Sequence, residues 1–232
     1  MHISNRLRMV AELVTDCRCL ADVGCDHGYL SIWLLRGNIC ERAVLMDLRK
    51  GPLSKAKENL AFFHMEERAE TRLSDGLAGL SPGEADALVI AGMGGELMSR
   101  ILTAYPSVTK SFRQLVLQPQ SDIPKVRKTL HGLGFTITDE DRVMEDGKLY
   151  QAFRGVPGEH PEYSEADYIS GAIGLKESGR TAELCFLSER IRKLKTILAG
   201  LPESDREEIR LKREEIEREL AETRKAEEAF SE

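Results

Sequence analysis

The chain has 232 residues, of which 41% are hydrophobic and 31% charged, and its formal net charge is −6. This composition is ordinary for a soluble globular protein, and no run of about 18 apolar residues predicts a transmembrane helix. Charged residues interrupt the N-terminus at Arg6, Arg8 and Glu12, so no secretory signal is expected and a cytoplasmic location is predicted.

The acidic excess is confined to the C-terminal third of the chain. Residues 1–154 hold 20 Lys and Arg against 20 Asp and Glu, whereas residues 155–232 hold 13 against 19. An acidic total argues weakly against nucleic-acid binding, because contacts to phosphates need local cations. The neutral N-terminal part can still carry a basic patch on one face.

The cysteine pattern argues against a disulfide framework and against a zinc site. The chain has five cysteines, an odd number, and no two of them form a Cys-x-x-Cys pair. We therefore expect free thiols in a reducing compartment and no bound metal.

Between residues 18 and 153, short strand-like runs alternate with helical patterns. Strands are expected over residues 19–23, 42–47, 69–73, 87–91 and 114–118, and helices over residues 29–36, 52–63, 97–102 and 124–130. This alternation predicts an α/β fold, with a mainly parallel sheet covered by helices on both faces. Residues 135–143 and 149–154 then form a closing hairpin, which adds an antiparallel edge strand.

The pattern changes after a linker at residues 155–158. Apolar residues then recur at heptad spacing, which predicts a coiled-coil-like helix: Leu184, Leu187, Ile191, Leu194, Leu198 and Leu201. Gly200 and Pro202 end this helix, and Ser204 with Glu207 has the spacing of a capping box for a second one. We expect two domains, residues 1–156 with the sheet and residues 157–232 with a helical hairpin.

The first strand ends in a glycine turn that carries two carboxylates, Asp22 and Asp26, in the run Asp22-Val-Gly24-Cys-Asp-His27-Gly28-Tyr29. In doubly wound sheets ligands bind at the carboxyl ends of the strands, next to this turn. The two glycines allow close approach of the backbone to a ligand. Carboxylates repel a pyrophosphate but suit a ligand with an ammonium and a sulfonium group, as in S-adenosylmethionine. The turn therefore favours Asp22, Gly24, Asp26, His27 and Gly28 as donor-binding residues over a dinucleotide site.

Two further acidic residues follow the second and third strands. Asp47 lies 23 residues after Gly24, close to the spacing of about 20 expected for an acid that binds ribose hydroxyls. Asp75, with Gly76 and Leu77, is a candidate contact for the adenine of the donor, although Asp-Gly is also common simply as a turn.

Glycines and carboxamides follow the fourth and fifth strands. Gly92-Met93-Gly94-Gly95 indicates close backbone approach at the point where a methyl donor would meet its acceptor. We expect Gly92 and Met93 to contact the donor, and Gly94 and Gly95 to contact the acceptor. Gln118-Pro119-Gln120 follows the fifth strand, where carboxamides can read the edge of a base.

Taken together, these motifs resemble the TrmK family of bacterial tRNA (adenine(22)-N1)-methyltransferases. The similarity rests on D-V-G-C-D-H-G-Y-L, S-D-G-L, A-G-M-G-G, L-V-L-Q-P-Q and E-D-G-K-L-Y, and it extends over the whole chain, including the coiled-coil-like C-terminus. The resemblance implies a Rossmann-like class I methyltransferase sheet that binds S-adenosyl-L-methionine and a tRNA. Ser31 stands where the family often has proline.

For adenine N1 as acceptor, we expect Asp26 to stabilise positive charge on the base or to bind the donor ammonium, with both roles open. Tyr29 is the second catalytic candidate, since its ring can stack on the base. The flipped base requires cations along the tRNA backbone, and seven are available: Arg6, Arg8, Arg49, Lys50, Lys125, Arg127 and Lys128. The alternatives are another RNA site, a small-molecule acceptor or a non-catalytic donor-binding scaffold. A monomer is expected, with dimerisation through the helical hairpin as the alternative.

Overall fold

A computed structural model describes the whole chain except residues 172–176, 203–205 and 232. The chain forms two compact units, Met1–Gly174 and Leu175–Glu232. Residues 157–171, which we expected to group with the helical part, lie in the first of these units. The predicted boundary between the methyltransferase domain and the helical domain, at residues 156/157, stays a prediction.

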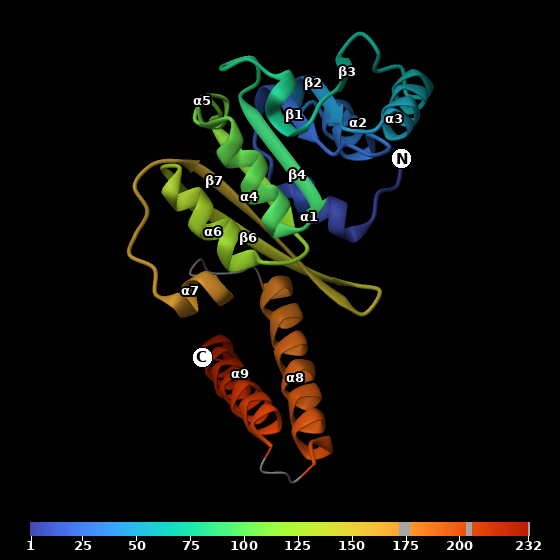
Figure 1. The fold of residues 1–232 in the computed structure, drawn as a ribbon. Helices are drawn as coiled ribbons and strands as arrows, with labels where there is room; N and C mark the ends of the chain where they lie inside the picture. The colour runs from blue at the N-terminus through green and yellow to red at the C-terminus, as the bar shows by residue number, and fades with distance from the viewer. Residues whose placement is uncertain (172–176, 203–205, 232) are drawn as a thin grey trace. The chain divides into compact units, whose positions relative to one another are not determined.

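The first unit has the expected alternation of strands and helices (Figure 1). Its strands are β1 (Cys17–Val23), β2 (Cys40–Asp47), β3 (Ala69–Leu73), β4 (Ala87–Met93), β5 (Gln114–Pro119), β6 (Phe135–Glu145) and β7 (Lys148–Pro157). Its helices are α1 (Asn5–Leu13), α2 (Tyr29–Arg36), α3 (Lys50–Phe62), the short 3-10 helix η1 (Gly76–Gly79), α4 (Gly95–Ala104), α5 (Pro106–Thr109), α6 (Ile123–Gly132) and α7 (Glu165–Ser170).

The strands form one sheet of seven in the order β3-β2-β1-β4-β5-β7-β6. The first five pair in parallel, whereas β7 pairs antiparallel with both β5 and β6. The expected antiparallel strand therefore exists, but it lies one position inside the edge, which β6 forms. Helix α1 was not predicted from the sequence, because its short apolar run has no long helical period.

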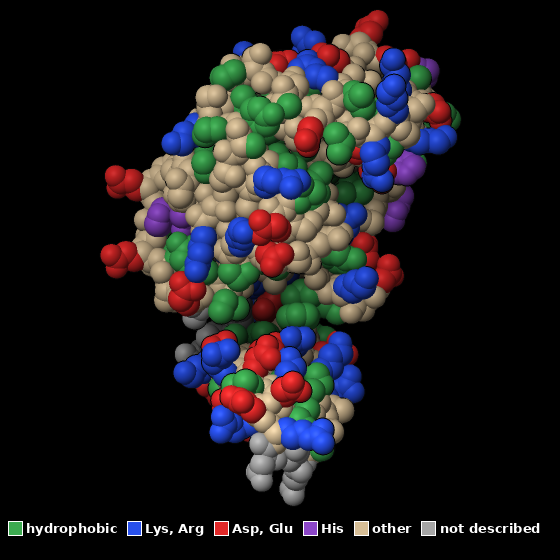
Figure 2. All heavy atoms as spheres, in the orientation of Figure 1, with side chains coloured by type: hydrophobic (Ala, Val, Ile, Leu, Met, Phe, Trp, Pro, Cys, Tyr) green, Lys and Arg blue, Asp and Glu red, His purple; other side chains and the backbone are tan. Residues whose placement is uncertain are grey.

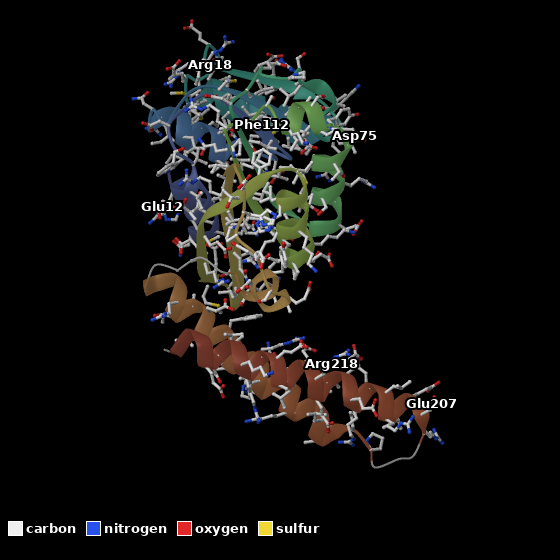
Figure 3. All side chains as sticks on the ribbon, turned by 90° about the vertical axis from the view of Figure 1, so that its left-hand side faces the viewer. Glu12, Arg18, Asp75, Phe112, Glu207 and Arg218 are labelled. Atoms are coloured by element: carbon white, nitrogen blue, oxygen red, sulfur yellow. The ribbon has the colours of Figure 1, made fainter. Side chains whose placement is uncertain are left out.

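Each face of the sheet has its own hydrophobic core. The face covered by α1, α2 and α3 buries alternate strand residues such as Leu20, Leu45 and Val89. The opposite face, covered by α4, α5 and α6, buries their neighbours, such as Ala21 and Leu88. Phe112 lies in this second core, inside the domain (Figure 3). Burial on both faces explains why the central strands are continuous apolar runs.

The second unit is a pair of long helices, α8 (Glu177–Gly200) and α9 (Glu207–Ser231). They run antiparallel, because Ser188 near the start of α8 bonds to Glu227 near the end of α9. Leu187, Ile191 and Leu194 of the predicted seam are buried. Glu207 and Arg218 project from α9 (Figure 3). Ser204, the expected cap, lies outside the described residues.

The thiols differ in exposure, which gives a labelling prediction. Cys185 is exposed, whereas Cys17, Cys19, Cys25 and Cys40 are buried. A hydrogen bond with Cys40, together with burial, raises the pKa of Cys17, and burial raises the pKa values of Cys19 and Cys25. Because thiolates are the reactive species, one thiol per folded chain should react quickly with a disulfide reagent and five in denaturant. Rapid reaction of two or more thiols in the folded protein would contradict this packing.

Candidate active site

The expected site residues between Asp22 and Gln120 lie in the last residues of strands β1 to β5 or in the segments that directly follow these strands. The parallel strands β1 to β5 all point their carboxyl ends to one edge of the sheet, and each is followed by one of the motifs. Ligands of open parallel sheets bind at such an edge. The fold therefore brings together side chains that lie up to about 100 residues apart in sequence, from Asp22 to Gln120.

The turn after β1 has the backbone that its glycines predict. Gly24 and Gly28 have φ values of +75° and +72°, a region that side chains other than glycine rarely adopt. The Gly24 and Cys25 amides both donate to the Met46 carbonyl, at 2.8 and 3.1 Å, so β2 fixes the turn. A Cβ at Gly24 would overlap the terminal methyl of Met93. The turns after β1 and β4 thus face each other.

Asp22 is a buried carboxylate beneath this turn. Its residue is 3% exposed, and its Oδ2 accepts a hydrogen bond from the Ser31 hydroxyl at 2.6 Å. Burial raises the pKa of Asp22 to about 6, the Ser31 bond opposes this shift, and the charge of Asp47 adds to it. Ser31, noted above as a departure from the family pattern, is therefore the direct partner of this carboxylate.

Asp26, His27 and Tyr29 lie on the exposed side of the turn. Asp26 has a left-handed φ of +49°, and its side chain is 69% exposed. The rings of His27 and Tyr29 are stacked, with centroids 5.7 Å apart and planes inclined by 12°. Tyr29 is 40% exposed although it begins helix α2. An accessible carboxylate therefore lies beside an accessible aromatic pair.

The acidic residues after β2 and β3 lie on neighbouring strands. Asp47 pairs with Leu73 in the sheet register, and its Oδ1 accepts from the Arg49 amide at 2.8 Å. Asp75 is exposed and directly precedes η1; its side chain is labelled in Figure 3. Gly76 has a φ of +56°, and Leu77 is buried in the core.

Two exposed leucines at the carboxyl ends of the strands were not predicted as site residues. Leu48 is 65% exposed directly after Asp47, and Leu73 is 53% exposed at the end of β3. Exposed leucines at the ends of adjacent strands, next to Asp47, provide an apolar wall for a flat ligand ring. Leu48 could have been noted from the sequence, because an apolar residue immediately follows the acidic one.

The glycine run after β4 is held against the loop after β5. Gly92 has a φ of +79°, and Gly94 precedes α4. The Gly95 amide donates to the Ser121 carbonyl at 3.0 Å, and a Cβ at Gly95 would overlap that carbonyl. Only glycine at position 95 allows this approach.

The Gln118-Pro119-Gln120 run divides into buried and exposed parts. Gln118 and Pro119 are buried, and Gln118 Oε1 accepts hydrogen bonds from the Gly92 amide at 3.1 Å and from Arg6 Nη1 at 2.8 Å. Gln120 is exposed. In this structure Gln118 and half-buried Arg6 are thus bonded to each other, whereas Gln120 and Arg8 are accessible.

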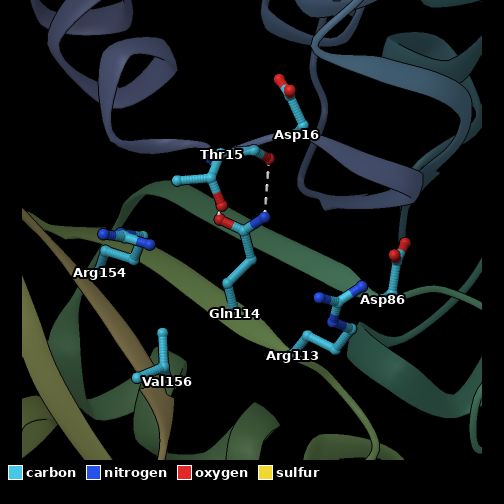
Figure 4. Close-up of a pocket in the computed structure, with 7 residues that line it drawn as sticks. All are labelled: Thr15, Asp16, Asp86, Arg113, Gln114, Arg154 and Val156. Carbon is cyan, nitrogen blue, oxygen red and sulfur yellow. Dashed lines mark hydrogen bonds between the residues drawn. The ribbon is translucent and has the colours of Figure 1, made fainter.

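A pocket of about 200 Å³ lies at the other end of the parallel strands, where β1, β4 and β5 begin (Figure 4). Its residues include Gln114, which begins β5 and exchanges hydrogen bonds with the Thr15 backbone at 2.8 and 3.0 Å. This pocket lies at the amino ends of the strands, away from the motifs. Among the described residues, no group of three or more His, Cys, Asp and Glu side chains is arranged to hold a metal ion.

The side chains at the carboxyl ends of strands β1 to β5 fit a cationic nucleoside ligand. Asp22 and Asp47 place carboxylates in the last residues of β1 and β2, and Asp26 and Asp75 follow β1 and β3. Glycines with positive φ lie after β1 and at the end of β4. Carboxylates bind ammonium and hydroxyl groups, whereas a pyrophosphate would be repelled. The residues present therefore fit S-adenosylmethionine.

Comparisons with known proteins show which family this chain belongs to. Residues 3–153 match the family model described as a methyltransferase domain. The tRNA (adenine(22)-N(1))-methyltransferase of Bacillus subtilis is 32% identical over 175 residues, which cover 75% of this chain and 73% of that protein.

Solved structures extend the similarity beyond the sheet. The B. subtilis M1A22 tRNA methyltransferase TrmK is 26% identical, with a TM-score of 0.79 over 97% of this chain and 99% of that one. Streptococcus pneumoniae Sp1610 in complex with S-adenosyl-L-methionine is 28% identical, with a TM-score of 0.84 over 97% of this chain and 100% of that one. These matches confirm the resemblance drawn from the motifs: the chain belongs to the TrmK family of tRNA (adenine(22)-N1)-methyltransferases.

Proposed function

We propose that this protein transfers the methyl group of S-adenosyl-L-methionine to N1 of adenine 22 in tRNA. The observation that carries the proposal is the succession of carboxylates in or directly after β1, β2 and β3, next to the glycine run at the end of β4. The first group matches the cationic and hydroxyl groups of the donor. The second has no side chains at positions 92, 94 and 95, so an acceptor can approach its backbone.

The donor supplies a methyl sulfonium that is intrinsically reactive toward a lone pair. Asp22 lies beneath the turn, where its carboxylate suits the donor ammonium, and Asp47 suits the ribose hydroxyls. Leu48 and Leu73 flank the adenine ring of the donor, and Asp75 accepts from its amino group. Together these side chains fix the donor so that the enzyme mainly needs to align the acceptor nitrogen.

Adenine N1 needs no prior deprotonation, since it carries a lone pair, but methylation leaves positive charge on the ring. Asp26 is accessible beside the turn, where its carboxylate stabilises this charge and accepts the N6 proton as the charge is lost. Tyr29, backed by His27, offers a face on which the flipped base stacks. Asp26 therefore acts on the acceptor in this scheme, with the donor ammonium as its other possible partner.

Contacts to the tRNA backbone fall to exposed cations, of which Arg8 is one. On the face shown in Figure 2, Lys and Arg side chains are interspersed with Asp and Glu instead of forming one basic patch. We propose that the α8–α9 hairpin braces the folded tRNA by shape. Its apolar seam is buried against α9 of the same chain, which supports a monomer. No helix in the described part of the chain is long and apolar enough to cross a membrane.

Methyl transfer to a mapped nucleoside tests the activity. Incubation with labelled S-adenosylmethionine and unmodified tRNA should give 1-methyladenosine at position 22, and a tRNA with guanine at this position should give none. Absence of 1-methyladenosine would overturn the proposal. Transfer to another position or to a small molecule would favour another acceptor, and donor binding without any transfer would favour a scaffold.

Donor affinity should depend on pH through Asp22. Because its pKa is raised to about 6, this carboxyl carries a proton in mildly acidic solution and is ionised at neutral pH. Binding of an ammonium favours the ionised form, so affinity should fall by up to about tenfold per pH unit below 6 and level off above it. Calorimetric titration with S-adenosylhomocysteine measures this, and Asp22→Asn should bind more weakly without the acidic fall. Equal wild-type affinity on both sides of pH 6 would remove Asp22 from the donor site.

A further inference from the structure

The E-D-G-K-L-Y motif at the β6–β7 turn has no place in the mechanism above, yet it contacts the start of α1. Glu145 Oε1 accepts a hydrogen bond from the Asn5 amide at 2.7 Å. This amide belongs to the first turn of the helix, where N–H groups lack partners within the helix and favour a negative charge. Glu145 therefore ties the hairpin to the helix that carries Arg6.

The same motif supports the Arg6 side chain. The Arg6 guanidinium carbon lies 5.6 Å from the centroid of the Tyr150 ring, within the range of a cation–π contact. Arg6 Nη1 also donates to Gln118 Oε1 at 2.8 Å. The guanidinium therefore has two partners, a ring that it contacts and a carboxamide oxygen to which it donates, and together they restrict its rotamers.

Gln118 extends this arrangement to the glycine run after β4. Its side chain is fully buried, and the oxygen that accepts from Arg6 also accepts from the Gly92 amide at 3.1 Å. A Cβ placed on Gly92 would lie 3.5 Å from Arg6 Nη1. The Gln118 side chain therefore orients the left-handed backbone at Gly92, and Arg6 in turn orients the Gln118 side chain.

We propose that Arg6, held by Tyr150, is a positioning residue: through Gln118 it sets the backbone of Gly92 where donor and acceptor meet. The inference rests on the proposed function and deepens it. It gives Arg6 and Gln118 a role behind the glycine run in place of the direct tRNA and base contacts expected from the sequence. A buried carboxamide with one charge-assisted bond holds an orientation better than one exposed to water.

Paired substitutions at Tyr150 test the inference. Tyr150→Leu removes the ring face and should lower kcat for tRNA by roughly 10- to 100-fold, because a displacement near 1 Å at a reacting centre costs about 100-fold. Tyr150→Phe keeps the ring face and should retain kcat within about twofold. Both variants should bind S-adenosylhomocysteine and tRNA as the wild type does. Arg6→Met should match Tyr150→Leu.

A matched control exists at the end of α2. The guanidinium carbon of Arg36 lies 5.5 Å from the ring centroid of Phe63, which is the same type of contact. This pair lies away from the candidate site residues. Arg36→Met should therefore leave kcat unchanged. An equal loss of kcat in this variant would show that any lost cation–π contact harms the enzyme, and would overturn the positioning role.

Hydrogen exchange separates this inference from the proposed function. Arg6→Met and Tyr150→Leu should speed deuterium exchange in a peptide spanning residues 91–95, whether or not the enzyme methylates tRNA. Unchanged exchange there would overturn the inference even with an active enzyme. A weaker tRNA affinity with a reduced salt dependence and an unchanged kcat would also overturn it, because Arg6 would then contact phosphate directly.

Discussion

Asp26→Asn should lower turnover on tRNA by about 100- to 10,000-fold, the range over which a positioned acid or base contributes to catalysis. The carboxylate is 69% exposed on the turn after β1, so it can reach a base that enters the edge of the sheet. Asparagine tolerates the left-handed φ of +49° and removes only the charge. Single-turnover methylation with saturating donor, compared with the affinity for S-adenosylhomocysteine, separates the two candidate roles of Asp26.

A loss of turnover with donor affinity within a fewfold of wild type would place Asp26 on the acceptor. Weaker donor binding with an unchanged rate at saturation would place it on the ammonium instead. Asp146→Asn is the matched control, because Asp146 also is exposed and has a left-handed φ of +51°. Wild-type turnover and wild-type donor affinity in Asp26→Asn would remove the residue from both roles.

Arg127→Met should reduce the free energy of unfolding by about 3–5 kcal/mol, the usual cost of removing one partner from a buried ion pair. Arg127 is fully buried, and its Nη2 lies 2.7 Å from Glu140 Oε2. Its Nη1 donates to the carbonyls of Tyr168 and Ile169 at 2.9 and 3.1 Å. The substitution leaves a buried carboxylate and two backbone acceptors with fewer donors, and urea denaturation measures the loss.

Lys125→Met provides the comparison on the same helix. Lys125 forms an exposed ion pair with Glu96, so its loss should change stability by less than about 1 kcal/mol. Adding Glu140→Gln to Arg127→Met should restore part of the loss, because the buried charge is then removed. A loss below about 1 kcal/mol in the single variant would show that the Arg127–Glu140 pair contributes little to the fold.

The sequence predicted the parts of the fold that depend on local pattern. Short apolar runs, which alternate with helical patterns along the chain, located the parallel strands. Gly24 and Gly92 marked turns, and both residues have positive φ values. The heptad spacing located the α8–α9 hairpin. Each of these features follows from neighbouring residues or from a fixed period, so one sequence is sufficient to infer it.

Features that depend on distant partners could not be inferred in this way. Arg127 was expected, with other cations, to be available to the tRNA backbone, yet it is fully buried against Glu140 of β6. Nothing local in the sequence indicates this burial. Gln118 and Arg6 are 112 residues apart in sequence, so their bond exists only in the folded chain. The sequence placed Arg6 and Gln118 in different motifs with different expected partners, and it did not indicate that they bond to each other.

The position of β7 links the first helix of the chain to its last strands. Helix α1 packs against β6 and β7, and β7 lies between β5 and β6 in the sheet. During synthesis α1 emerges before the strands of the sheet, but its apolar side chains Met9, Val10 and Leu13 have no complete surface to cover until residues up to Pro157 are available. Non-local pairing of this kind slows folding and leaves apolar surface exposed meanwhile. On the ribosome, the sheet unit should therefore become protease-resistant in one late step, after β7 leaves the exit tunnel, rather than strand by strand.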